Sequence, residues 1–269
     1  LRTYSIGLKG SVDLYWARIA ADYLGTDHHE ICVTEKDFLD AIPKTIKQIE
    51  SFCTTTIRAS VGNYLVSLYI KENTPDTVIY CGDVSDEIFG SYRGFMNAPD
   101  DESFLEANIK MLKDICYFDV LRSDRSISGA GLEARVPFGD KYLVNYVMSL
   151  PPKYKTFGKD KIEKYYLRKA FEGYLPHDLL YRKKEAFSDG VSSLERNWFD
   201  IIKEYVDKII PDNIDFAKGF NGPQPYDKES YWYRTIYDEH FKNIVLIPYY
   251  WRHPFCNQLD PSARLLKCY

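Results

Sequence analysis

Short strand-like segments alternate with helical segments through the first 82 residues, and this alternation constrains the fold more than any other feature. The strand-like segments span residues 3–8, 28–33 and 77–82, and apolar residues at helical spacing fill the chain between them. Strands that alternate with helices of this length form βαβ units, whose strands are parallel. The sequence therefore predicts an α/β fold in which helices flank a parallel sheet.

The ends of these helices carry capping signals. Ser11 is suited to the N-cap of the first helix, and Gly25 to the left-handed residue that follows its end. Thr34 is suited to cap a second helix, with Asp37 three residues later as in a capping box. A third helical stretch covers about residues 57–72. These signals predict three helices before the last of the three strands.

Strand signals nearly vanish after residue 100. The sequence there predicts helices over residues 103–126, 140–150, 161–174 and 197–210. The tail from residue 211 is rich in proline, glycine and aromatic residues, and we expect it to wrap the surface. The sequence thus predicts one domain at residues 1–210, mostly helical in its second half, with an extension at 211–269 that packs on it.

Composition and charge exclude several classes of protein. The net charge is −4, and Lys and Arg are spread along the chain without the basic stripe that a nucleic-acid partner needs. No apolar run reaches the roughly 18–20 residues of a membrane span. The six cysteines are scattered without a C-x-x-C pair, which argues against a structural zinc site and a disulfide framework. We expect a cytoplasmic protein with no nucleic-acid partner and no membrane partner.

Three carboxylates follow the third strand, in the segment TVIYCGDVSDEIFGSY. Asp83, Asp86 and Glu87 lie where open parallel sheets bind ligands, outside the carboxyl end of a strand. Two carboxylates ~4 Å apart repel by about 4 kcal/mol at the effective dielectric of a protein surface. The segment is therefore either a solvated loop, capped by Ser85 onto a helix, or a cleft whose carboxylates need a divalent cation or a lysine. Magnesium held by carboxylates together with substrate phosphates would indicate nucleotide chemistry.

Two further segments carry side chains suited to anions. CTTTIRAS, residues 53–60, places three hydroxyls and Arg58 where a helix begins, which suits either an anion site or an N-cap run with a surface arginine. YRKKEAFSDG, residues 181–190, is either a solvated basic turn or a turn that aims one lysine inward. The five histidines form no nucleophilic arrangement with Cys or Ser.

Seven segments stand out when they are taken in order along the chain: LRTYSIGLKGS-DL, ADYLGTDHHE, TTIRAS, CGDVSDEIFGSY, LEARVPFGDK, KIEKYYLRKAFEGYLP and RKKEAFSDGV. Together they resemble the synthetase half of the glutamine-hydrolysing asparagine synthetases. The similarity covers about residues 1–200 and resumes in the tail at PYDKESYWYRTIYDEHF and DPSARLL.

The resemblance implies a fold and a reaction. The fold is adenine-nucleotide α-hydrolase-like, of the PP-loop ATPase type. The side-chain carboxylate of aspartate attacks the α-phosphorus of ATP, with Mg²⁺ beside the phosphates, and gives β-aspartyl-AMP and pyrophosphate. Ammonia, released from glutamine in a separate N-terminal domain, then displaces AMP to give asparagine. The implied enzyme is a ligase of asparagine biosynthesis.

The resemblance also implies roles for residues at the first and third strands. Ile6 takes the backbone position that contacts adenine, and Cys81 and Gly82 lie where the family's Ser-Gly touches the nucleotide. Asp83 replaces a Glu associated with formation of the acyl-adenylate. Asp86 is the carboxylate implied for Mg²⁺ and pyrophosphate.

Other implied roles fall on the two anion-suited segments. Thr55, Thr56 and Arg58 match residues associated with binding aspartate or controlling pyrophosphate release. Lys184 matches a lysine expected to steady the charged transition state and the pyrophosphate. Ser85, beside the magnesium carboxylate, is implied to contact substrate or pyrophosphate.

The sequence departs from the family pattern in three places. The family reads S-G-E-G-S-D-E where this chain reads C-G-D-V-S-D-E, so Asp83 is one methylene shorter than Glu and Val84 replaces Gly. If that position needs a positive φ, a β-branched residue there costs about 1–2 kcal/mol. The family reads TTIRAST-P where this chain reads TTIRASVGN. The family's pyrophosphate loop S-G-G-x-D-S, which precedes its equivalent of the first strand, does not occur here.

The sequence opens at Leu1 almost directly in the first predicted strand. We therefore expect the natural protein to continue upstream with the pyrophosphate loop and a glutaminase domain, through which the family suggests a homodimer. We expect the 269-residue chain alone to be inactive.

Two alternatives stay open. One is a degenerate, non-catalytic relative that acts as a binding or regulatory module, as Cys81, Asp83 and Val84 suggest. The other is a sibling enzyme that adenylates a different carboxylate to form an amide, as in β-lactam synthetase. The source of ammonia, glutamine or solution, is likewise open.

Overall fold

The computed structural model describes residues 1–158, 160–216 and 219–266 of the chain. Its strands are β1 (Arg2–Leu8), β2 (Asp27–Val33), β3 (Val78–Tyr80) and β4 (Glu133–Arg135). Its longer helices are α1 (Val12–Leu24), α2 (Glu35–Ile49), α3 (Thr54–Asn73), α5 (Asp101–Asp114), α6 (Asp119–Gly129), α7 (Lys141–Ser149), α11 (Trp198–Ile209) and α12 (Lys228–Phe241). Its shorter helices are α4 (Ser85–Ile88), α8 (Tyr165–Ala170), α9 (His177–Leu180) and α10 (Phe187–Gly190).

The strands form two small parallel sheets. β1 pairs with β2 in a register that sets Ile6 opposite Ile31, and β3 pairs with β4. Parallel strands joined by helical crossovers are compatible with the predicted α/β class. The sequence predicted one sheet, whereas β1 and β3 belong to separate sheets in the described part of the chain. A groove of about 880 Å³ lies between these two strands and is also lined by α3.

The predicted caps are confirmed. The Ser11 side chain accepts a hydrogen bond from the Leu14 amide, and Gly25 has the left-handed φ of 63° that ends α1. Thr34 and Asp37 form the two reciprocal hydrogen bonds of a capping box at α2. These elements could be predicted because each cap depends on residues only three positions apart.

Two of the helices predicted after residue 100 are shorter or broken. Residues 103–126 contain α5 and α6, separated by a 3-10 turn and by Phe118, whose φ of −130° and ψ of −97° are not helical. This turn buries the Phe118 ring, which is 4% exposed. Within residues 161–174 only α8 is α-helical, because Lys164 has a φ of 56° before it and Gly173 a φ of 86° after it.

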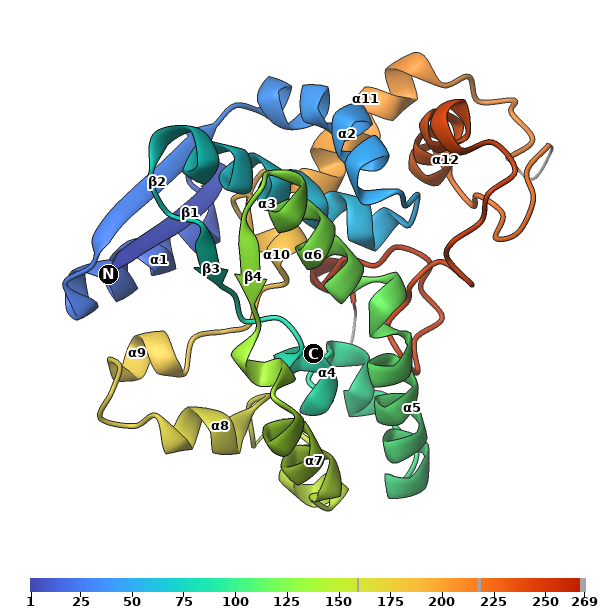
Figure 1. Cartoon of the computed structure of the whole chain (residues 1–269). Helices are drawn as coiled ribbons and strands as arrows, with labels where there is room; N and C mark the ends of the chain where they lie inside the picture. Colours follow the sequence, from blue (N-terminus) through green and yellow to red (C-terminus); the bar gives the residue numbers. More distant parts are fainter. Residues whose placement is uncertain (159, 217–218, 267–269) are drawn as a thin grey trace.

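The tail contributes to the core, so the expectation that it wraps the surface is wrong for α12. Helix α12 packs against α2, α3 and α11 (Figure 1). Its Tyr233 and Tyr237 side chains are fully buried, in the same cluster as Phe38 of α2 and Trp198 of α11. Their hydrophobic burial ties residues 228–241 to the first part of the chain.

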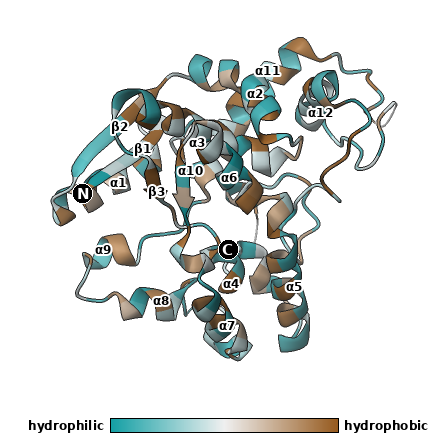
Figure 2. Cartoon of the chain, in the orientation of Figure 1, coloured by the Kyte–Doolittle hydropathy of each residue, from teal (hydrophilic) through white to brown (hydrophobic). Residues whose placement is uncertain are grey.

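Hydrophobic and hydrophilic residues are interleaved along the helices, as Figure 2 shows for α2, α5 and α7. Such interleaving gives each helix one face for the core and one for water. Across the described ranges, no helix combines the length and the apolar character that crossing a membrane requires.

Candidate functional site

A cleft of about 560 Å³ opens where the chain leaves β3. Six of the residues predicted for the site line it: Thr55, Gly82, Asp83, Ser85, Asp86 and Lys184. The carboxyl end of β3 lies here, which is where a parallel sheet places its ligand. The other four, Ile6, Cys81, Thr56 and Arg58, are described residues that do not belong to the lining of this cleft.

Asp86 lies between two lysines. Lys184 Nζ is 2.6 Å and Lys164 Nζ 2.8 Å from Asp86 Oδ1. Burial would raise the pKa of the Asp86 carboxyl, but the two ammonium groups hold that pKa well below its usual range. Of the two interpretations of the acidic segment, the structure therefore supports a cleft with cationic partners over a solvated loop.

The backbone conformation before α8 brings Lys164 into the cleft. Lys164 has a left-handed φ of 56°, and its Nζ also donates to Ser85 Oγ at 2.9 Å. Ser85 Oγ in turn donates to the Gly82 carbonyl. The sequence predicted Ser85 as the cap of this helix, and that prediction is wrong. Ser85 is the first residue of α4, and Val84 occupies the N-cap position. The Ser85 hydroxyl therefore links the Gly82 carbonyl of the loop to the Lys164 ammonium group.

Asp83 pairs with an arginine from α6. Arg122 Nη2 lies 2.7 Å from Asp83 Oδ1 and 3.3 Å from Asp119 Oδ1. Burial raises the pKa of Asp83, but the Arg122 guanidinium, together with hydrogen bonds from Ser123 and Cys81, more than offsets this, so the pKa is lowered overall. The side chain of Asp83 is therefore a carboxylate held in place, 15% exposed, at the wall of the cleft.

Val84 adopts the backbone conformation that the family's Gly would favour. Its φ is 75° and its ψ −23°, in the left-handed region. The side chain is nonetheless buried, and it packs with Ile88, Phe89 and Val147. The strain of a β-branched residue at positive φ, about 1–2 kcal/mol, is offset by this packing.

This strain predicts that Gly at position 84 is less destabilising than Ala, the reverse of the usual order. We expect Val84→Gly to retain more stability than Val84→Ala, by about 1 kcal/mol, because both lose the packing but only Gly relieves the positive φ. Urea unfolding of the two variants measures the difference. Greater stability of the Ala variant would contradict the left-handed conformation.

Asp86 is the residue that fits a magnesium ion best. The close contacts from Lys164, Lys184 and Ser91 all reach Oδ1, which leaves Oδ2 for a metal. The described residues contain no group of three or more Asp, Glu, His or Cys side chains placed to hold a metal by themselves. An ion held here would therefore rely on one carboxylate and on phosphate oxygens, as magnesium commonly does.

The residues predicted to contact the nucleotide lie on or just after the strands. Ile6 is in the second half of β1, 2% exposed. Cys81 follows β3, and its amide donates to the Arg135 carbonyl of β4. A side chain added at Gly82 would meet no atom within 4 Å, so open space adjoins this residue. Of the three, Gly82 lines the cleft and Cys81 lines the groove between β1 and β3.

Arg58 points away from the cleft into a buried ion-pair network. Its guanidinium donates to both carboxylate oxygens of Glu229, at 2.8 and 2.6 Å, and to both of Asp260, at 2.9 and 2.8 Å. Arg58 and Glu229 side chains are 4% and 5% exposed. The anion partners of Arg58 are therefore residues of the tail. The neighbouring Thr55 and Thr56 hydroxyls are buried without a hydrogen-bond partner among the described residues.

Sequence reasoning missed the cations that complete this cleft. Arg122 and Lys164 lie outside the acidic segment, 39 and 78 residues from their carboxylate partners. Neither has a distinctive local pattern, although KIEKYYLRKAFEGYLP, which contains Lys164, is one of the segments that carry the resemblance. That resemblance was the signal from which Lys164 could have been found. The spacing of the residues alone does not connect Lys164 to Asp86.

His253 also lines the cleft, and the sequence assigned it no role. Its Nε2 donates to the Pro261 carbonyl at 3.0 Å, so Nδ1 is the unprotonated nitrogen, and Nδ1 has no partner among the described residues. Burial, with a smaller effect from Lys184, lowers the pKa of His253 to about 4. The imidazole is therefore neutral at physiological pH.

The His253 pKa predicts a loss of stability in acid. Because the folded pKa lies below the unfolded value of about 6.5, the unfolded state binds a proton first as the pH falls. This effect costs about 2 kcal/mol between pH 7.5 and pH 5. The difference in unfolding free energy between the parent chain and His253→Gln, measured by urea at both pH values, isolates it from other titrating groups. An identical pH dependence in both proteins would contradict the assignment.

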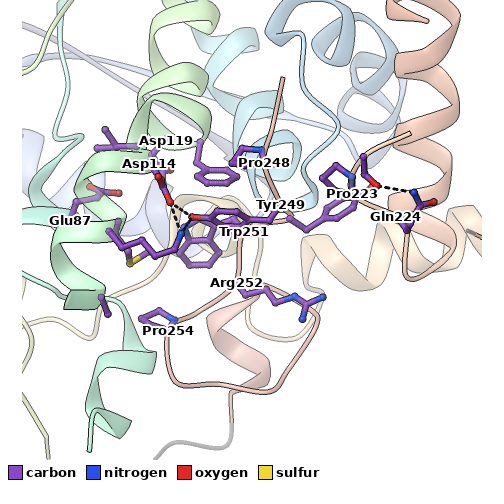
Figure 3. Close-up of a pocket in the computed structure, with 17 residues that line it drawn as sticks. Glu87, Asp114, Asp119, Pro223, Gln224, Pro248, Tyr249, Trp251, Arg252 and Pro254 are labelled. Carbon is purple, nitrogen blue, oxygen red and sulfur yellow. Dashed lines mark hydrogen bonds and ion pairs between the residues drawn. The ribbon is translucent and has the colours of Figure 1, made fainter. Parts of the chain in front are cut away.

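A second cavity, of about 740 Å³, adjoins the cleft (Figure 3). Glu87, Asp119 and Trp251 line both spaces. Within this cavity, Tyr249 donates to Asp114 at 2.5 Å, and Lys110 donates to Tyr249 at 2.6 Å. Lys110 and Asp114 therefore satisfy each other within this cavity.

Comparison with known proteins identifies the family of this chain. The asparagine synthase family matches residues 1–110 and 97–246. The glutamine-hydrolysing asparagine synthetases of Gallus gallus and Homo sapiens are each 40% identical over 274 residues, and that of Cricetulus griseus is 41% identical. These alignments cover 100% of this chain and 49% of each relative, so the chain spans about half the length of the curated relatives it matches. The predicted resemblance is confirmed, and the chain belongs to the asparagine synthase family.

Proposed function

We propose that this chain forms the site at which a larger protein amidates aspartate to asparagine with ATP through β-aspartyl-AMP, with ammonia supplied from glutamine outside these 269 residues. The observation that carries the proposal is the cluster of Asp86, Lys164 and Lys184 at the carboxyl end of β3. Two ammonium groups and one carboxylate in an open cleft suit a triphosphate with its metal. The family relationship indicates aspartate as the substrate.

In the first step, a side-chain oxygen of aspartate attacks the α-phosphorus of ATP. The bond from that phosphorus to its bridging oxygen breaks, and pyrophosphate leaves with the electron pair. Lys184 and Lys164 are placed to neutralise the negative charge that develops on the leaving group, which is the largest source of acceleration for such a step. The hydroxyl of Thr55, in the same cleft, is a candidate to orient the aspartate.

In the second step, ammonia attacks the activated carbonyl carbon, and AMP leaves as one proton of the ammonia is released. Asp83, held by Arg122, faces the same cleft and is the proposed residue for the acyl-adenylate stage. Asp86 Oδ2 would hold Mg²⁺, which supplies positive charge on the phosphate oxygens when bound. Ile6, Cys81 and Gly82 remain the proposed adenine-nucleotide contacts.

We propose that the fold is of the PP-loop ATPase type and that one further strand completes it. β1 and β3 each have one edge that pairs with no described strand, and the groove between them is about 880 Å³. Arg2 and Tyr4 of β1 reach across to Asp76, just before β3. A parallel strand in this groove would deliver a pyrophosphate loop to the cleft at its carboxyl end.

The remaining proposals follow the family. Residues 1–210 form the synthetase domain and 211–269 an extension packed on it. The partners are aspartate, ATP, and ammonia or glutamine; a homodimer and a cytoplasmic location stay predictions. Arg58, Thr56 and Ser85 stay predicted residues for substrate or pyrophosphate.

A product assay tests this function. Protein from the natural source, supplied with ATP, Mg²⁺, ammonium and a single carboxylate substrate, should form AMP and asparagine in equal amounts from L-aspartate. Bulkier β-amino acids in the same panel should give no amide. Turnover of a bulkier substrate would favour the sibling adenylating enzyme, and the absence of any product would favour the non-catalytic relative.

A further inference from the structure

One carboxylate in the cleft has no partner. Asp13 of α1 lines the cleft, and no hydrogen bond or ion pair reaches its side chain from the described residues. Every other acidic residue of the lining has a hydrogen-bonded or ion-paired partner: Asp83 with Arg122, Asp86 with two lysines, Glu87 and Asp119 with Tyr92, and Glu185 with Arg264. Asp13 is therefore the carboxylate of this cleft that is left for a ligand.

A capping role does not account for Asp13. Ser11 already caps α1 by accepting from the Leu14 amide. The Asp13 carboxylate lies against Gly190, where an added side-chain carbon would come within 2.3 Å of Oδ2. Burial raises the pKa of Asp13 to about 6. A partly buried carboxylate without a donor is costly, and a bound cation would remove that cost.

A cation with almost no partner of its own lines the same cleft. The side chain of Arg182 donates only to the carbonyl of the next residue, at 3.5 Å, and makes no ion pair with the described carboxylates. Arg182 is the strongest of the charges that act on Asp13, although the two groups are more than ion-pair distance apart. Their opposite charges thus face one cleft with a gap between them.

We propose that Asp13 binds the α-ammonium group and Arg182 the α-carboxylate of the amino-acid substrate. This inference rests on the proposed function, because adenylation uses only the side-chain carboxylate of aspartate and leaves its zwitterionic end to be recognised. An ammonium group matches an acceptor-only carboxylate, and a planar guanidinium takes a carboxylate with two parallel hydrogen bonds. The side-chain carboxylate is then free to extend toward the lysines at Asp86.

Ligands that lack one charge test the two assignments separately. Binding is measured by calorimetry on the protein as its natural source makes it and on variants of that protein, with a non-hydrolysable ATP analogue and Mg²⁺ present, for L-aspartate, succinate and β-alanine. Succinate lacks the ammonium group, and β-alanine lacks the α-carboxylate. Asp13→Asn should weaken L-aspartate and β-alanine by about 10-fold to 100-fold and leave succinate unchanged. Arg182→Gln should weaken L-aspartate and succinate by a similar factor and leave β-alanine unchanged.

The control is Asp22→Asn, which removes an exposed carboxylate from the same helix and should change no affinity. Circular dichroism confirms that each variant folds. If the parent chain binds L-aspartate and Asp13→Asn binds it equally well, the inference is wrong while the proposed function stands. If Asp13→Asn weakens binding of the ATP analogue and leaves binding of L-aspartate unchanged, Asp13 contacts the nucleotide and the inference is wrong. A parent chain that binds neither ligand would overturn the inference together with the proposed function.

Discussion

Replacing Lys184 with Ala lowers aspartate-dependent pyrophosphate release by about 100-fold to 1000-fold and leaves the fold intact. Lys184 Nζ lies 2.6 Å from Asp86 and is placed to neutralise the leaving pyrophosphate. The side chain is 16% exposed and contributes to no hydrophobic cluster, so its loss removes charge from the cleft and little packing. The measurement is the rate of pyrophosphate release at saturating ATP and aspartate, with circular dichroism as the check on folding.

The matched control is Lys183→Ala. Lys183 is the exposed neighbour of Lys184, so this variant makes the same change in net charge outside the cleft. It should release pyrophosphate at the parent rate. Parent-level release by Lys184→Ala, or an equal loss in the two variants, would contradict the assignment of Lys184.

Replacing Arg58 with Ala destabilises the protein by about 3–5 kcal/mol. The substitution leaves Glu229 buried without its cation and removes the partner of Asp260. The guanidinium also joins α3 to α12 and to the end of the tail, so the loss spreads across three segments. Urea unfolding should show a lower midpoint with an unchanged dependence on urea.

Arg196→Ala provides the comparison for this experiment. Arg196 also contacts two carboxylates, Glu35 and Glu204, but its side chain is 41% exposed. Exposed pairs contribute about 0–1 kcal/mol because water screens them. If Arg58→Ala lowers the free energy of unfolding by no more than Arg196→Ala does, the buried network does not stabilise the fold.

Features that depend on neighbouring residues could be predicted from the sequence. The caps at Ser11 and Thr34 and the helix at residues 197–210 involve residues three or four positions apart, and each appears within a few residues of its predicted place. The acidic segment after β3 was likewise recognised as a site because strand, glycine and carboxylates are consecutive in the chain. The consequence of Val84 was also predictable, since a valine at a glycine position implies strain at positive φ.

Features that depend on distant partners could not be predicted in this way. Lys184 meets Asp86 across 98 residues, and Arg58 meets Glu229 across 171. The pattern at residues 53–60 indicated an anion for Arg58, but local spacing gives no sign that the anion is a carboxylate of the tail. The burial of Tyr233 and Tyr237 has the same origin, because an aromatic-rich tail becomes core only when α2 and α3 are there to receive it.

The most direct test of the central claim, that this cleft activates aspartate with ATP, is isotope exchange between pyrophosphate and ATP. Protein from the natural source should exchange label only when both L-aspartate and Mg²⁺ are present, because exchange requires reversible formation of β-aspartyl-AMP. Lys184→Ala should lower the exchange rate by about 100-fold to 1000-fold. A folded protein that binds ATP and L-aspartate but shows no exchange would contradict the claim, and the cleft would then belong to a non-catalytic member of the family.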